Sequence, residues 1–127
     1  MLDSMEASAD GRLDDRAALE VMGWVRGGPD SEFWVLGDAP AGLTSVFRMP
    51  VTRWRPTKDR FCLDLLLEEL RARRLVVEVS DSGQGEERAC TCTIAESEDA
   101  APVIEVTATT MGLAVVCAAV AYQQSKQ

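Results

Sequence analysis

The chain has 127 residues, a formal net charge of -8 at pH 7 and a sequence pI near 4.5. This length suits one domain with its own hydrophobic core and is short for two. The negative charge disfavours binding to nucleic acid or anionic membranes, and it suits either an ordinary solvated surface or a basic partner. The chain contains no histidine, which excludes Ser-His-Asp and Cys-His catalytic arrangements and histidine-ligated zinc. We therefore predict that the protein is not an enzyme.

The first residues are acidic, polar and small, a composition that cannot bury enough surface to offset the entropy lost on ordering. We predict a flexible acidic tail over residues 1–11 and a single domain over residues 12–127. Because the start of the chain lacks the basic and apolar regions of a secretory signal, we expect the protein in the cytoplasm with its thiols reduced.

A first helix is predicted from Asp14, which can cap it, to Trp24 or Val25, before the breakers of the Gly27–Pro29 stretch. Its apolar residues recur at helical spacing and predict one buried face: Ala17, Ala18, Val21, Met22 and Val25. Two short runs rich in β-forming residues follow, over residues 33–36 and 44–48. They are separated by glycines and a proline, which predicts a hairpin or a pair of edge strands.

A second, amphipathic helix is predicted over residues 61–74. Its apolar stripe consists of Cys62, Leu63, Leu66, Leu67 and Leu70. Glu69 can pair with Arg73 four residues later. Three strands are then predicted over residues 75–80, 88–94 and 103–107, as an antiparallel meander.

The last helix is predicted to begin at Thr109 or Thr110, either of which can cap it. Residues 110–122 are apolar on every side, yet a bilayer-spanning helix needs about 20 such residues. Protein must therefore cover this helix, either between the sheet and another helix or at an oligomer interface. The order of elements predicts an α+β fold, a mostly antiparallel sheet packed with about three helices in a layered sandwich.

Four cysteines raise the question of a disulfide or a metal site. Cys62 and Cys117 lie in apolar helical runs, where cysteine behaves as a small hydrophobe. Cys90 and Cys92 alternate along a predicted strand, so they share a sheet face and do not form the C-x2-C turn that zinc prefers. We predict no metal and no cofactor.

Three segments of the sequence resemble the phage ABA sandwich domain family, small proteins of uncharacterised function encoded by bacteriophages and prophages. A Met-Gly-Trp signature ends the first helix of that family and is matched by residues 22–24. A proline, a Ser or Thr and then an Asp open its middle helix, matched here by Pro56, Thr57 and Asp59. An alanine-rich helix closes the family pattern and is matched by residues 108–122. The resemblance implies a phage origin and a sandwich fold, and it implies no mechanism.

One basic cluster stands out from the acidic chain, and its members are the predicted binding residues: Arg53, Trp54, Arg55, Lys58 and Arg60. Helix amides that begin after Thr57, together with the preceding arginines, could hold a phosphate, a nucleotide or an acidic side chain. The tryptophan could stack on a base or an arginine. The arginines could equally neutralise the protein's own acids or solvate a loop.

These features predict a small phage or prophage accessory protein that acts by binding a macromolecular partner, such as a host factor, in the host cytoplasm. We expect a protein partner, no membrane association, and a monomer or homodimer. The alternative is a binder of a nucleotide or another phosphorylated small ligand that uses the Arg53–Arg60 region.

Overall fold

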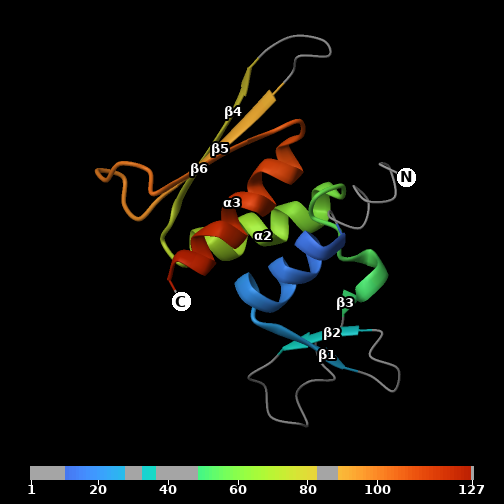
Figure 1. Ribbon diagram of the computed structural model, residues 1–127. Helices are drawn as coiled ribbons and strands as arrows, with labels where there is room; N and C mark the ends of the chain where they lie inside the picture. Colours follow the sequence, from blue (N-terminus) through green and yellow to red (C-terminus); the bar gives the residue numbers. More distant parts are fainter. Residues whose placement is uncertain (1–10, 28–32, 37–48, 83–88, 127) are drawn as a thin grey trace.

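The computed structural model describes residues 11–27, 33–36, 49–82 and 89–126, and these form two three-stranded antiparallel sheets with helices between them (Figure 1). The α+β fold predicted from the sequence is confirmed. The sequence suggested one sheet, whereas the strands divide into sheet A, with the order β1-β2-β3, and sheet B, with the order β4-β5-β6. The predicted tail up to residue 10 and the predicted strand over residues 44–48 lie outside the described residues.

The first helix occupies residues 11–21 and becomes π-helical over η1 (Ala17–Val21). It ends earlier than the sequence predicted because Gly23 has a φ of 73°, a conformation that disfavours any side chain. Trp24 and Val25 therefore belong to a strand, β1 (Trp24–Gly27), which pairs with β2 (Phe33–Leu36). The predicted helical end at these two residues is wrong.

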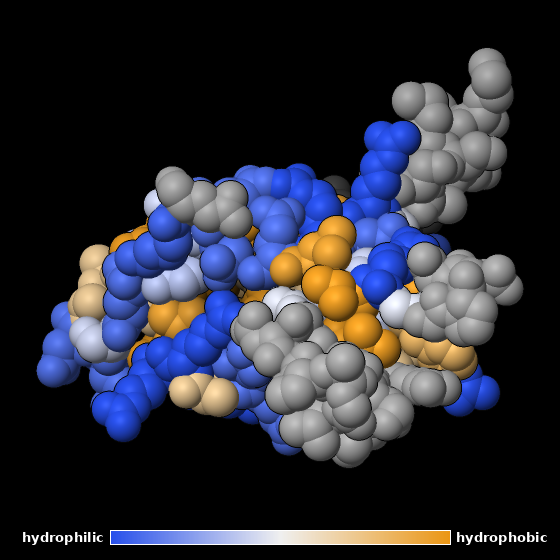
Figure 2. All heavy atoms as spheres, turned by 90° about the horizontal axis from the view of Figure 1, so that it is seen from below, coloured by the Kyte–Doolittle hydropathy of each residue, from blue (hydrophilic) through white to orange (hydrophobic). Residues whose placement is uncertain are grey.

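Sheet A is completed by β3 (Met49–Pro50), two residues long, which leads into the short 3-10 turn η2 (Val51–Arg53). Sheet A lies at the bottom of the molecule in Figure 1. Viewed from that side, hydrophobic residues gather between hydrophilic ones (Figure 2). Val25 of β1 is 43% exposed.

The amphipathic helix is α2 (Arg60–Ala72), and the predicted apolar stripe is its buried face. Asp59 caps it by accepting hydrogen bonds from the backbone N–H groups of Phe61 and Cys62. The predicted Glu69–Arg73 pair is confirmed, at 3.2 Å between Oε1 and Nη2. Arg73 also donates hydrogen bonds to the Val21 carbonyl and to Gln123, so one side chain joins three helices.

The predicted meander is confirmed as sheet B, formed by β4 (Val76–Ser82), β5 (Ala89–Ala95) and β6 (Ile104–Ala108). Cys90 and Cys92 share the inner face of β5, as predicted, and both are buried. The outer face is polar: Glu78, Thr93 and Glu105 are paired across it in one row.

The last helix, α3 (Met111–Ser125), lies against β5 and β6 on one side and against η1 and α2 on the other. Thr110 caps it, accepting a hydrogen bond from the backbone N–H of Leu113 at 3.2 Å. Helix α3 thus occupies the middle layer between the sheet and the other helices, as predicted for a helix apolar on every side. No helix in the described ranges has the length and apolar character needed to cross a membrane.

Gly112 sets how closely α3 approaches the segment before α2. A Cβ atom added there would lie 2.5 Å from the Thr57 carbonyl oxygen and 2.8 Å from that of Pro56. Both obstacles are backbone atoms, which cannot rotate away as a side chain can.

We predict that Gly112→Ala destabilises the protein by about 1–3 kcal/mol, the usual cost of overpacking a well-packed site. Gly11→Ala is the matched control, because nothing lies within 4 Å of a Cβ atom built at that helical position. Urea unfolding of both variants measures the difference, and equal stability of the two would contradict the close approach.

Candidate functional site

A buried junction positions the predicted binding segment. Asp14, predicted as a helix cap, instead lies inside the first helix, and its side chain crosses to Thr57. Its Oδ1 accepts from the Thr57 backbone N–H at 3.1 Å, and its Oδ2 accepts from the Thr57 hydroxyl at 2.9 Å. Both residues are buried, so the segment that leads into α2 is held against the first helix.

Trp54 belongs to this junction rather than to a ligand site. It is 1% exposed, its Nε1–H donates to the Asp14 carbonyl at 2.8 Å, and its ring packs edge-to-face with that of Trp24, with 4.6 Å between the ring centroids. A ring enclosed in this way has no open face, so the prediction that Trp54 stacks on a base or an arginine is wrong. Trp24 is likewise a core residue, at 5% exposure.

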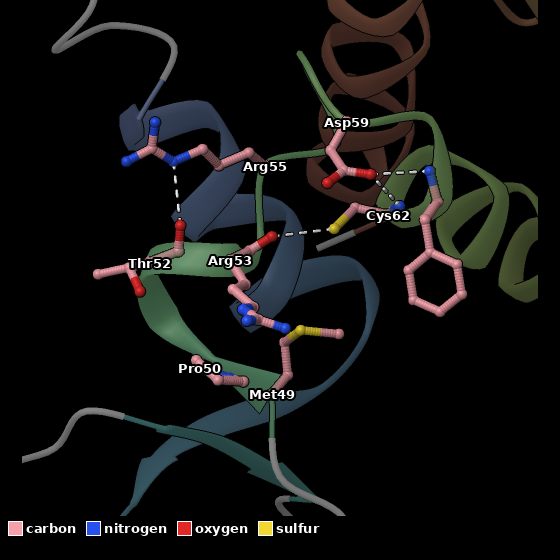
Figure 3. A pocket seen from close by; sticks show the side chains of 8 residues that line it. Met49, Pro50, Thr52, Arg53, Arg55, Asp59 and Cys62 are labelled. Atoms are coloured by element: carbon pink, nitrogen blue, oxygen red, sulfur yellow. Dashed lines mark hydrogen bonds between the residues drawn. The ribbon is translucent and has the colours of Figure 1, made fainter.

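Beside the junction lies a hollow of about 590 Å³, named here the Met49–Phe61 hollow (Figure 3). Its walls come from the β3–η2 segment and from the start of α2. The lining residues are Met49, Pro50, Thr52, Arg53, Arg55, Asp59, Phe61 and Cys62. The structure thus brings two of the predicted binding residues, Arg53 and Arg55, to one concave surface.

The cap of α2 changes the expected electrostatics of this surface. The sequence suggested that free amides at the start of the helix would attract a phosphate. Instead, the Asp59 carboxylate accepts from the amide of Phe61 at 2.8 Å and from that of Cys62 at 3.4 Å. Because an anion of the chain itself already occupies these donors, the cationic character of the hollow comes from Arg53 and Arg55.

The other two predicted residues point elsewhere. Lys58 is exposed and lines a second hollow together with Arg55 and the buried Trp54, on the side of Asp14 and Asp15. Arg60, the first residue of α2, makes an exposed ion pair with Asp64, at 3.0 Å between Nε and Oδ1. Of the predicted residues, only Arg55 lines both hollows.

Cys62 lines the hollow but is not poised as a nucleophile. Its thiol donates a hydrogen bond to the Arg53 carbonyl at 3.1 Å (Figure 3). Burial raises the pKa of this thiol above its ordinary value, and the neighbouring carboxylates of Asp59 and Asp14 add to the rise. Cys62 is thus held as a thiol rather than as the reactive thiolate. Within the described ranges, no three His, Cys, Asp or Glu side chains are grouped so as to hold a metal ion.

Sequence reasoning missed Phe61, which lines the hollow and is 67% exposed. The signal was present, because Phe61 falls on the side of α2 that carries Asp64 and Glu68, opposite the apolar stripe. An aromatic residue on a polar helix face is an identifiable exception. Met49 and Pro50 could not have been found in the same way, since only the pairing of β3 with β2 brings them to this place.

Comparisons of the chain with protein-family models, with curated proteins and with solved structures find no match.

We predict that Asp14→Ala lowers the free energy of unfolding by about 1–3 kcal/mol, because it leaves two buried Thr57 donors without their acceptor. Asp15→Ala is the matched control: this neighbouring acid makes a half-exposed ion pair with Arg26, and we expect a loss of roughly 0–1 kcal/mol. Chemical denaturation measures both values. Equal losses would show that the buried contact stabilises no more than the surface pair.

We also predict that Cys92 resists alkylation in the native protein at mildly alkaline pH, while Cys117, which is less buried, reacts faster. Burial raises the pKa of the Cys92 thiol to about 11. The folded state therefore keeps a proton that the unfolded chain releases above its ordinary pKa of 9.0, so stability declines as the pH rises from about 9 to about 11. Iodoacetamide labelling followed by peptide mass spectrometry checks the order of reactivity, and faster labelling of Cys92 would contradict it.

Proposed function

We propose that this chain is a small phage or prophage accessory protein that acts in the host cytoplasm by binding a protein partner, such as a host factor, without catalysing a reaction. One observation carries the proposal: the Met49–Phe61 hollow combines an exposed aromatic side chain with two arginines on an otherwise acidic molecule. Aromatic and arginine side chains are the residues most enriched at the energetic centres of protein interfaces.

The distribution of charge supports a contact role for this region. The described residues between Leu75 and Ala108 contain no Lys or Arg and carry six acids: Glu78, Asp81, Glu96, Glu98, Asp99 and Glu105. The described residues between Met49 and Arg60 carry four bases and one acid, Asp59. This segregation gives the molecule a basic end beside an acidic sheet, and it can orient a charged partner during encounter.

The chemistry of the hollow supports binding over catalysis. The hollow is lined by a capping carboxylate, Asp59, by a buried thiol, Cys62, and by the hydroxyl of Thr52. The carboxylate is engaged by two backbone amides, and the thiol has a raised pKa. The chain contains no histidine that could serve as the general base for either group.

The phage origin in this proposal depends on the sequence resemblance. The residues of the motifs that carry this resemblance have physical roles in the structure. Gly23 of the Met-Gly-Trp motif takes a positive φ, and Trp24 packs on Trp54. In the second motif, Thr57 binds Asp14 and Asp59 caps α2. The motifs therefore support a shared fold, and they do not identify a functional residue.

The alternative function is binding of a nucleotide or another phosphorylated small ligand. The observation that favours it is the presence of Arg53 and Arg55 on one hollow, since guanidinium groups bind phosphate oxygens in pairs. The Asp59 carboxylate on the same surface would repel a dianionic phosphate, so this alternative is the weaker one.

We predict that immobilised wild-type protein retains a stoichiometric protein from lysate of a host bacterium and that Phe61→Ser retains at least about tenfold less, equivalent to 1.4 kcal/mol of binding energy. Leu19→Ser is the matched control, because it removes an exposed apolar side chain, 50% accessible, that does not line the hollow. Quantitative mass spectrometry of the retained proteins checks the result. Equal retention by the wild type and by Phe61→Ser, or turnover of a substrate by the purified chain, would refute the proposal.

A further inference from the structure

We infer that the Met49–Phe61 hollow binds a short peptide segment of the partner in which an Asp or Glu lies next to an apolar side chain. This inference rests on the proposed function and names the chemistry of the partner at the same surface. It depends on two sets of groups that line one hollow: arginines without a counter-ion among the described residues, and exposed or half-buried apolar side chains.

The arginines are the reason to expect a carboxylate in the bound peptide. Arg53 makes no side-chain hydrogen bond or ion pair within residues 11–27, 33–36, 49–82 and 89–126. Arg55 uses its Nε–H on the Thr52 carbonyl at 3.1 Å, and its terminal N–H groups have no partner in the same ranges. Guanidinium groups of this kind can hold a carboxylate through paired, charge-assisted hydrogen bonds.

The apolar side chains of the hollow are the reason to expect a hydrophobic residue next to that carboxylate in the peptide. Phe61 is 67% exposed, although the same helix buries every member of its apolar stripe. Met49 and Pro50 are half-buried and line the same hollow. An aromatic anchor beside a flexible methionine is typical of surfaces that accept a partner's side chain.

Two features favour a peptide over a phosphate group or a nucleic acid. The Asp59 carboxylate lines the hollow and occupies the amides at the start of α2, so a dianionic phosphate would meet a negative charge where a helix normally offers free donors. The net charge of -8 also repels a nucleic-acid backbone over the rest of the surface. A single carboxylate matches the local charge, since two arginines and one aspartate leave one positive charge.

The experiment is selection of a random dodecapeptide library against the purified full-length chain. We expect enriched sequences that place Asp or Glu beside Leu, Phe, Trp or Met. The best peptide, labelled with a fluorophore, should bind at least about tenfold more weakly to Arg53→Ala and to Phe61→Ser, and replacement of its acid by the amide should weaken it similarly. Arg71→Ala is the matched control, because Arg71 is an exposed arginine of α2 that does not line the hollow; it should leave the affinity unchanged.

Several results would overturn the inference: no enriched sequence, enrichment of basic sequences, or equal binding by the wild type and Arg53→Ala. Tighter binding of oligothymidylate or of inorganic phosphate than of any selected peptide would overturn it in favour of a phosphate ligand. A partner retained from lysate in a Phe61-dependent manner, with no acidic peptide selected, would refute this inference alone. Selection of acidic peptides by a chain that also turns over a substrate would refute the non-enzymatic function and leave the peptide site standing.

Discussion

The contact between the Asp14 carboxylate and Thr57 is the interaction on which the rest of the structure depends. It fixes the segment before α2 to the first helix through two buried hydrogen bonds, and Trp54 adds a third from its indole N–H to the Asp14 carbonyl. Helix α3 reaches the other side of this segment, where Gly112 lies against the Pro56 and Thr57 carbonyls. A carboxylate without these partners would be a costly buried group, so the first helix, the segment before α2 and α3 must assemble together.

Helix α3 explains why the proposed binding surface lies at the periphery. Because it is apolar on every side, it must be covered by sheet B on one side and by η1 and α2 on the other. That arrangement fills the interior with small and branched side chains. The polar chemistry then falls on the outer face of sheet B and on the turns around η2, and the second of these contains both a concave surface and cationic groups.

The start of α2 shows how one capping residue changes the kind of ligand that a surface can bind. A helix of this length with an unfilled start, next to arginines, would be a phosphate site. Asp59 supplies its own anion to that position, so the hollow combines a modest positive charge with Phe61 and the β3 residues. The proposed preference for an acidic, apolar peptide follows from this balance.

The sequence by itself determined the elements whose signals are local. The stripe of Leu66 and Leu70 repeats within a few residues, the alternation of Cys90 and Cys92 follows the pleat of a strand, and Thr110 caps the helix that it precedes. Even the exposure of Phe61 could have been inferred from its position on the helix. Only the tertiary structure decided that Trp54 is buried, that Asp14 binds Thr57 and that the strands form two sheets. These outcomes depend on contacts between residues about 40 positions apart, such as Trp54 with Asp14, and the pattern of a single segment carries no information about which distant segment will cover it.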